Sequence, residues 1–172
     1  MEEKLIPRIE ILAEKKLAGM KLRMSVQEDR TSELWKSFMP KVKTIRGRLN
    51  SDLYSLQVYS SGMDFTRFDA GKTFEKWALA EVSDFEAIPE GMEKFILPGG
   101  LYAVFSYKGP VSSGPEIFRY IFGTWLPVSG YIIDDLPHFE ILGERYSNVS
   151  PESEEEIWIP VRSKAVKKNC NP

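Results

Sequence analysis

Hydrophobic and polar residues alternate with a period of two along most of this chain, which is the pattern of half-buried β-strands. Over residues 9–25 the alternation predicts extended structure that breaks near Gly19, either as a strand pair or as one bent strand. The same pattern predicts five further strands, over residues 53–59, 74–82, 101–107, 137–142 and 156–161. Residues 62–71 and 83–95 contain Gly or Pro and are expected to be connections.

Two segments have apolar residues at helical spacing instead. In the first, Pro40 is expected to kink or divide the helix, and the candidate N-cap residues are Asp29, Thr31 and Ser32. In the second, Pro115 suits a first turn and Pro127 limits the end. The apolar residues are Leu34, Trp35, Phe38, Val42 and Ile45 in the first helix and Ile117, Phe118, Ile121 and Trp125 in the second.

The order of these elements repeats after about 83 residues. The shift places Leu34 on Ile117 and Gln57 on Glu140, and brings Trp77 close to the strand that holds Trp158. A duplicated strand-helix-strand-strand unit predicts an α+β fold, with two adjacent antiparallel sheets, two main helices on one side and a small-molecule groove between the halves. We expect one domain over residues 1–162, with pseudo-repeats at about 5–85 and 95–162.

Composition and charge exclude several classes of protein. The 172 residues carry a net charge of −2, which does not suit a protein that mainly neutralises nucleic-acid phosphates. One cysteine, Cys170, and one histidine, His138, exclude a disulfide framework and a Cys/His zinc site. No metal or cofactor is expected, and the basic residues Arg162, Lys164, Lys167 and Lys168 are assigned to a flexible tail at 163–172.

The chain is expected to be soluble and cytoplasmic and to make no membrane contact. It begins without the basic start and apolar run of a signal peptide, and no stretch approaches the ~20 apolar residues that span a bilayer.

Glu140 is the residue most suggestive of chemistry, because it stands inside the apolar run 139–142 and faces away from Phe139 and Ile141. It is either a partly buried anion that a cationic or hydrogen-bond-donating ligand would stabilise, or a solvent-facing carboxylate, or a partner of Arg145 or a lysine. Glu156, after an acidic run, is either a pocket residue or part of a solvated edge. His138 is expected to be structural.

Aromatic residues make up 12% of the sequence, so some can form a binding surface as well as core. A wall for a flat or cationic ligand is one interpretation, since cation–π attraction is strongest over indole, and core packing is the other. The candidates are Trp77, Tyr102, Tyr107, Trp125 and Trp158.

Several motifs of the second half together resemble the GyrI-like small-molecule-binding domains, which also form the effector-binding part of many AraC-type and MerR-type transcription regulators. The motifs are LPGGLYAVF (97–105), KGP (108–110), TWLP (124–127), SGY (129–131), PHFE (137–140) and EIWIPV (156–161). The first half matches this family more by the order of its elements.

The resemblance implies a pair of SH2-like strand-helix-strand-strand motifs around a groove that holds aromatic, hydrophobic or cationic compounds. It implies that Glu140 supplies the central negative charge, and Glu156 matches an acidic position common in the family. With Gln57, which the repeat places on Glu140, the expected ligand-binding set is Glu140, Trp77, Tyr102, Tyr107, Trp125, Glu156, Trp158 and Gln57.

The resemblance favours a stand-alone drug or toxin sensor or sequestering protein. No helix-turn-helix domain accompanies the motifs, so direct nucleic-acid binding is not expected, and a regulatory protein partner is one of the alternatives. Two alternatives are a hydrolase of cyclopropane-bearing genotoxins, with Glu140 as general base and Tyr107 or Tyr102 nearby, and a protein-partner modulator such as a DNA gyrase inhibitor.

Overall fold

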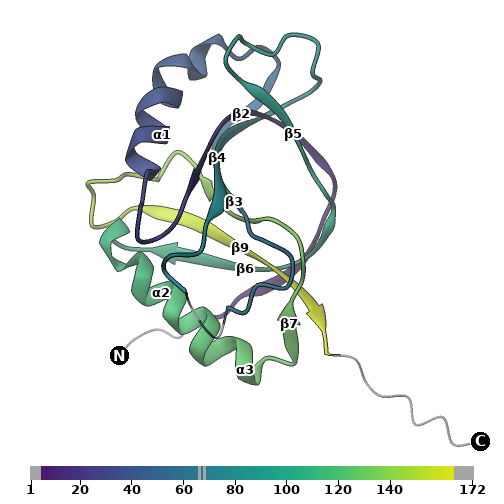
Figure 1. Cartoon of the computed structure of the whole chain (residues 1–172), viewed down its shortest axis with the longest axis vertical. Coiled ribbons are helices and arrows are strands. Elements are labelled where there is room, and N and C mark those ends of the chain that lie inside the picture. Colours follow the sequence, from purple (N-terminus) through teal and green to yellow (C-terminus); the bar gives the residue numbers. More distant parts are fainter. Residues whose placement is uncertain (1–4, 66, 68, 165–172) are drawn as a thin grey trace, which may run out of the picture.

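The computed structural model describes residues 5–65, 67 and 69–164, and within them the chain forms two similar halves built on one antiparallel sheet (Figure 1). The first half contains β1 (Arg8–Leu12), β2 (Lys15–Met24), α1 (Thr31–Phe38), the 3₁₀ helix η1 (Met39–Thr44), β3 (Arg48–Val58) and β4 (Phe74–Val82). The second contains β5 (Glu93–Leu97), β6 (Gly100–Lys108), the 3₁₀ turn η2 (Val111–Ser113), α2 (Gly114–Tyr120), the π-helical turn η3 (Ile121–Trp125), α3 (Leu126–Val128), β7 (Tyr131–Ile133), β8 (His138–Leu142) and β9 (Glu154–Ser163).

The halves meet edge to edge where β3 pairs with β8, from Leu53 opposite Leu142 to Gln57 opposite His138. The strand order is therefore β1-β6-β9-β8-β3-β4-β2-β5, and β7 pairs with β9 beside this path. The prediction of two adjacent sheets is wrong in this respect. Because β3 and β8 share backbone hydrogen bonds, the sheet runs without a break from one half into the other.

Each half contributes one edge strand that pairs with a strand of the other half. β1 pairs with β6 of the second half, and β5 pairs with β2 of the first. The sequence prediction missed β5 and the three-residue β7, because short edge strands carry little alternation of their own.

Gly19 lies inside β2, and the break predicted there falls between β1 and β2 instead. A Cβ at this position would lie 1.9 Å from the carbonyl oxygen of Ala78 on the neighbouring strand. The glycine thus marks a close approach of two backbones rather than a break in the strand, and both are common reasons for glycine in strands.

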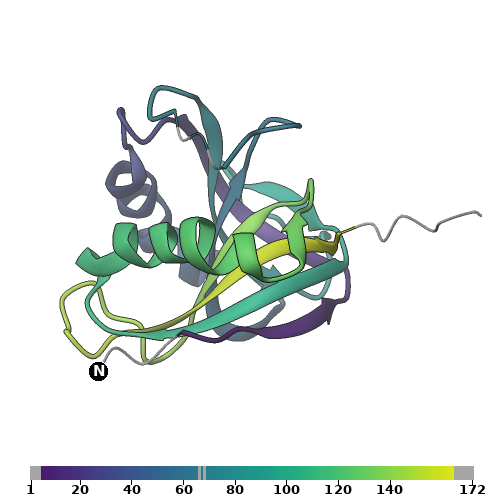
Figure 2. The ribbon, with the colours of Figure 1, turned by 90° about the horizontal axis from the view of Figure 1, so that it is seen from below.

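The helices cover one face of the sheet, as the predicted apolar spacing requires (Figures 1 and 2). Leu34 and Phe38 of α1 pack on β4, and Ile121 packs with β6 and β9. Pro40 follows the end of α1 in η1, which confirms the predicted division of the first helix. Asp29 accepts a hydrogen bond from the Thr31 amide at 2.9 Å.

The opposite face carries a third apolar cluster, which joins both halves around the pair Leu56 and Phe139. It contains Leu12, Leu17, Tyr54, Leu56, Trp77, Leu79, Leu97, Tyr102, Val104, Phe139 and Trp158. We call the two sides of the sheet the helix face and the core face. Of the predicted tail, residues 165–172 lie outside the described residues.

Candidate functional site

Gln57 and Glu140 meet at the junction of the two halves, on the helix face. Ser55 lies opposite Glu140, and Gln57 lies opposite His138. These side chains share a face with Ala78 under α1 and with Ile157 under α2, because Ala78 pairs with Ser55 and Ile157 with Glu140. Gln57 Nε2 donates a hydrogen bond to Glu140 Oε2 at 3.2 Å, and the two residues are 83 positions apart.

A second carboxylate, that of Glu155, lies near Glu140. Burial, and then the charge of Glu140, raise the pKa of Glu155 to about 7, and Lys76 opposes this shift. Burial and the same two carboxylates also raise the pKa of Tyr146. Two acids therefore share a partly buried region with one nearby lysine, and this arrangement favours the approach of a cation.

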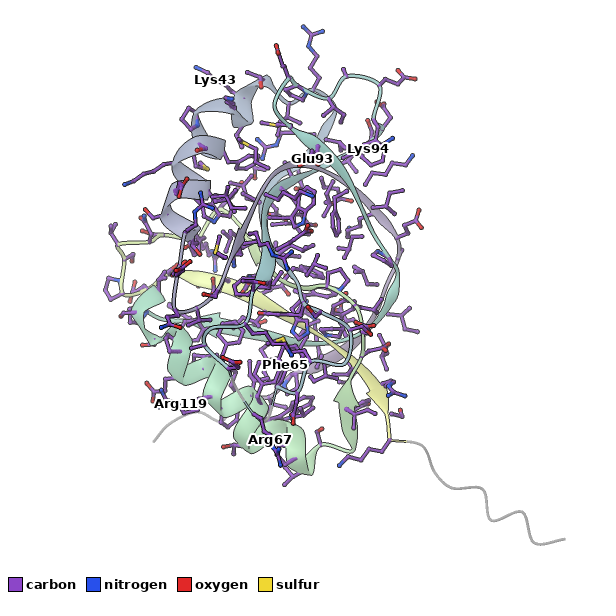
Figure 3. All side chains as sticks on the ribbon, viewed as in Figure 1. Lys43, Phe65, Arg67, Glu93, Lys94 and Arg119 are labelled. Carbon is purple, nitrogen blue, oxygen red and sulfur yellow. The ribbon has the colours of Figure 1, made fainter. Side chains whose placement is uncertain are left out.

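Aromatic rings adjoin this acidic pair. Burial and the Glu140 charge raise the pKa of Tyr59, whose ring centroid lies 4.9 Å from that of His138. Phe65, labelled in Figure 3, stacks on Phe122 at 5.3 Å and lies 4.7 Å from His138. Burial lowers the pKa of His138 to about 3, so its imidazole is neutral at physiological pH and behaves as one more ring of the cluster.

Two open hollows border the β3–β8 pair. One, of about 430 Å³, is lined by Asp52, Ser106, Tyr107, Lys108, Ile141, Gly143, Glu144, Arg145, Glu154, Glu155 and Glu156. The other, of about 350 Å³, is lined by Tyr59, Ser60, Ser61, Gly62, Met63, Phe65, Ile133, Asp134, Asp135, Leu136, His138 and Arg162. Glu140 stands on β8 between His138, which lines the second hollow, and Ile141, which lines the first.

Three of the aromatic candidates lie on the core face, away from Glu140. Trp77, Tyr102 and Trp158 are 4%, 0% and 6% exposed and belong to the central cluster. The Tyr102 hydroxyl donates to the Pro137 carbonyl oxygen at 2.8 Å. The structure therefore does not bring these three rings together with Glu140.

Trp125 and Tyr107 belong to the helix-face cluster of the second half. The Trp125 ring packs edge-on against Phe105 at 5.1 Å, beneath the helical segment. The Tyr107 hydroxyl donates to the Pro110 carbonyl oxygen at 3.0 Å, and its side chain lines the larger hollow with Glu155.

Glu156 is on the other side of the sheet from Glu140, because β9 turns successive side chains to opposite faces. It forms an ion pair with Arg8 of β1. The acid of this run that joins Glu140 is its neighbour Glu155.

Sequence reasoning missed Glu155, Lys76, Tyr59, Phe65 and Phe122. The alternation along β9 contained the signal for Glu155, which shares its face with Ile157 and Ile159, the residues packed under α2. Lys76 could have been found in the same way on β4. Phe65 could not, because it lies in the connection between β3 and β4 and has no periodicity around it.

Among residues 5–65, 67 and 69–164, no group of three or more His, Cys, Asp or Glu is arranged to hold a metal ion. In the same part of the chain, no helix has both the length and the apolar character needed to cross a membrane.

Comparison with known proteins gives concordant matches. The transcriptional regulator BrlR of Pseudomonas aeruginosa is 26% identical over 147 residues, which are 84% of this chain and 51% of BrlR. The chain thus spans about half the length of that curated relative.

Among solved structures, SAV2435 bound to tetraphenylphosphonium has a TM-score of 0.69 at 16% identity, covering 91% of this chain and 93% of SAV2435. A hydrolase from Listeria innocua has a TM-score of 0.57 at 12% identity, covering 94% of each chain. At such identities the likeness shows a common fold. The family profile is more specific, since the GyrI-like small molecule binding domain matches residues 6–162, and this chain belongs to that family.

Proposed function

We propose that this chain binds hydrophobic aromatic cations on the helix face and acts as a sensor or sequestering protein for such compounds. The observation that carries the proposal is the pair of partly buried carboxylates, Glu140 and Glu155, beside a cluster of aromatic rings. Family membership supports binding of a small molecule, and the site chemistry narrows the class of ligand.

The acidic pair would supply the attraction for positive charge. Glu140 accepts a hydrogen bond from the neutral amide of Gln57, which orients the carboxylate without cancelling its charge. Lys76 is the cation that affects Glu155, so one lysine faces two acids. A cationic ligand would replace the water that solvates these carboxylates and would gain from their reduced exposure.

The rings would supply the apolar contact. Tyr59 and His138 lie within 4.9 Å of each other by ring centroids and stand next to Glu140 on the same face. Aromatic faces attract cations, and they remove apolar ligand surface from water. Tetraphenylphosphonium, the ligand of the similar SAV2435 structure, is a cation of this aromatic kind.

The test is titration of the purified protein with rhodamine 6G or tetraphenylphosphonium, comparing the wild type with Glu140→Gln. We expect saturable binding whose Kd rises tenfold or more in the variant, about 1.4 kcal/mol or more. Glu90→Gln is the matched control, because it removes the same charge from an exposed position in the connection between β4 and β5. No binding of either cation by the wild type would refute the proposal.

A second candidate function is hydrolysis of an electrophilic aromatic compound, and one observation favours it. The raised pKa of Glu155, about 7, suits a general base at physiological pH. The fold is also that of a hydrolase from Listeria innocua. Mass spectrometry of the compound after incubation distinguishes the two functions: gain of one water molecule, abolished in Glu155→Gln, would indicate catalysis, and recovery of intact compound would indicate binding alone.

A further inference from the structure

Phe65 occupies a position that an aromatic ligand could take. Its ring lies 5.0 Å from Tyr59, 4.7 Å from His138 and 5.3 Å from Phe122, measured between ring centroids. The Phe122 contact is nearly parallel, with an angle of 14° between the planes. Phe65, labelled in Figure 3, thus packs against η3 from the connection between β3 and β4.

The three rings around Phe65 come from regular elements or their ends, and His138 contacts both of the others. Tyr59 follows β3, His138 begins β8, and Phe122 belongs to η3. His138 lies 4.9 Å from Tyr59 and 6.2 Å from Phe122. We call Tyr59, Phe122 and His138 the aromatic box. Because its members are held by the sheet and the helix, the box does not depend on Phe65 for its assembly.

Phe65 itself is attached by the connection between β3 and β4. Ser61 Oγ donates to Asp135 at 2.9 Å, and the Gln27 backbone amide donates to the Ala70 carbonyl oxygen at 2.9 Å. Two turns of the connection are closed by backbone hydrogen bonds, from the Met63 amide to the Ser60 carbonyl oxygen at 3.2 Å and from the Arg67 amide to the Asp64 carbonyl oxygen at 3.3 Å. The Phe65 side chain packs against the rings of Tyr59, Phe122 and His138. A ligand ring can make contacts of the same kind with these three rings, so it can compete with the Phe65 ring for the same position.

Space for the displaced ring is available next to the box. The hollow of about 350 Å³ is lined by Phe65, Tyr59 and His138. This is more than twice the volume of an apolar cavity of about 150 Å³ that admits benzene. The hollow therefore offers room for a displaced Phe65 ring.

We propose that the aromatic box is a binding subsite for a planar aromatic ring, and that Phe65 is its built-in occupant, which a ligand displaces. The inference rests on the proposed function in one respect: a ring seated in the box would carry its positive charge toward Glu140, which lies two residues from His138 on the same face of β8. Phe65 then sets the affinity for aromatic ligands by competing with them.

The experiment compares wild type, Phe65→Ala and Phe65→Leu by isothermal titration calorimetry with two probes, rhodamine 6G and neutral indole. In Phe65→Ala we expect rhodamine 6G to bind about tenfold more tightly and indole to bind measurably, whereas the wild type binds indole at least tenfold more weakly. Phe65→Leu retains an apolar side chain, guards against a folding defect and should give an intermediate result. Phe122→Ala added to Phe65→Ala should remove the gain for both probes.

Phe85→Ala is the matched control, because it makes the same substitution at a partly buried phenylalanine packed in the α1 cluster, and it should change neither affinity. Indole binding to Phe65→Ala without rhodamine binding to any variant would support the ring subsite and refute the cation proposal. Glu140-dependent rhodamine binding that neither Phe65 variant improves would refute the ring subsite and leave the cation proposal standing. Absence of indole binding to folded Phe65→Ala would likewise overturn the subsite.

Discussion

The two halves of the sheet carry different side chains at positions that strand pairing makes equivalent. Leu56 and Phe139 face each other at the junction, and Trp77 and Trp158 occupy the same position beside them, one in each half. On the helix face, Gln57 of the first half corresponds to Glu140 of the second. Three residues before each tryptophan, Phe74 corresponds to Glu155.

This difference gives the site its polarity. The first half contributes the neutral amide of Gln57 and the aromatic pair Tyr59 and Phe74, whose ring centroids are 5.3 Å apart. The second contributes the carboxylates of Glu140 and Glu155. A duplicated scaffold thus carries both carboxylates on its second half, whereas the neighbouring rings come from both halves.

The core face shows the same contrast between similar frameworks. A cation lies over each tryptophan, Lys21 over Trp77 at 5.1 Å and Arg8 over Trp158 at 5.8 Å, measured to the ring centroid. Lys21 belongs to β2 of the same half, whereas Arg8 comes from the edge strand β1 lent by the first half. Similar contacts have therefore been built from different strands.

The largest expected effect concerns backbone spacing in the two halves. Gly19 of β2 corresponds to Tyr102 of β6, since they pair with Leu79 and Pro160, each two residues past the tryptophan. We expect Gly19→Ala to lower the free energy of unfolding by about 2–3 kcal/mol, because its Cβ would overlap the Ala78 carbonyl. Urea denaturation followed by circular dichroism measures the loss.

The control for this prediction is Gly123→Ala, where an added Cβ meets nothing within 4 Å. That variant should keep or slightly raise the stability, by up to about 1 kcal/mol, because alanine restricts the unfolded chain. If Gly19→Ala is as stable as the wild type, both halves tolerate a side chain at this position. The claim that the two backbones approach each other more closely in the first half would then be wrong.

The sequence predicts much of this framework because local periodicity is strong. The alternation along β4 and the helical spacing around Ile121 were sufficient to place these elements, and the repeat brought Gln57 onto Glu140. Pairing between distant segments was not predictable in this way. The role of Gly19 and the edge strand β5 depend on contacts that no local pattern records.

The candidate site was predicted only in part, because alternation defines two faces of a strand without saying what each face meets. Glu156 shares a face of β9 with Trp158, and the sequence prediction assigned the ligand site to that face. It therefore did not include Glu155, which lies on the opposite face near Glu140. The helix cluster that contains Ile157 and Ile159 determines which face is which, and it forms only when α2 packs. The position of the Phe65 ring depends on the same packing, because it stacks on Phe122 in the turn that follows α2.

A smaller effect is expected from the acid that replaces Phe74 in the second half. Burial raises the pKa of Glu155 from its ordinary 4.5 to about 7, so the folded protein binds more protons than the unfolded chain between these values. Stability from this group is therefore greatest below pH 4.5 and falls as the pH rises toward 7. Glu155→Gln should be more stable than the wild type at pH 8 by about 1–3 kcal/mol, and should lose this dependence.

Urea titrations at pH 5, 6, 7 and 8 test the point, with Glu152→Gln as an exposed control that should retain the wild-type profile. The affinity for rhodamine 6G in the wild type should rise over the same window, because a bound cation favours ionised Glu155. An identical pH profile in Glu155→Gln and wild type would show that Glu155 does not titrate as described, and the acidic end of the site would then rest on Glu140.

The smallest effect separates the two tryptophans on the core face. Trp77 Nε1 donates to Glu75 Oε1 at 3.2 Å, whereas Trp158 Nε1 is buried and has no hydrogen-bond acceptor within the part of the chain that the structure describes. Glu75→Ala should therefore cost about 1 kcal/mol, because it leaves an indole donor unpaired. Glu156→Ala removes only the partly exposed ion pair with Arg8 and should cost about 0.5 kcal/mol or less.

Urea denaturation and tryptophan fluorescence of the two variants measure this difference, and Glu75→Gln, which keeps an acceptor oxygen, should recover most of the loss. Glu75→Ala is expected to shift the fluorescence more than Glu156→Ala, since it alone changes the partner of an indole N–H. Equal losses in the two alanine variants would mean that the indole hydrogen bond contributes nothing measurable. The ion pairs of Lys21 with Glu75 and of Arg8 with Glu156 would then make the halves energetically alike on this face.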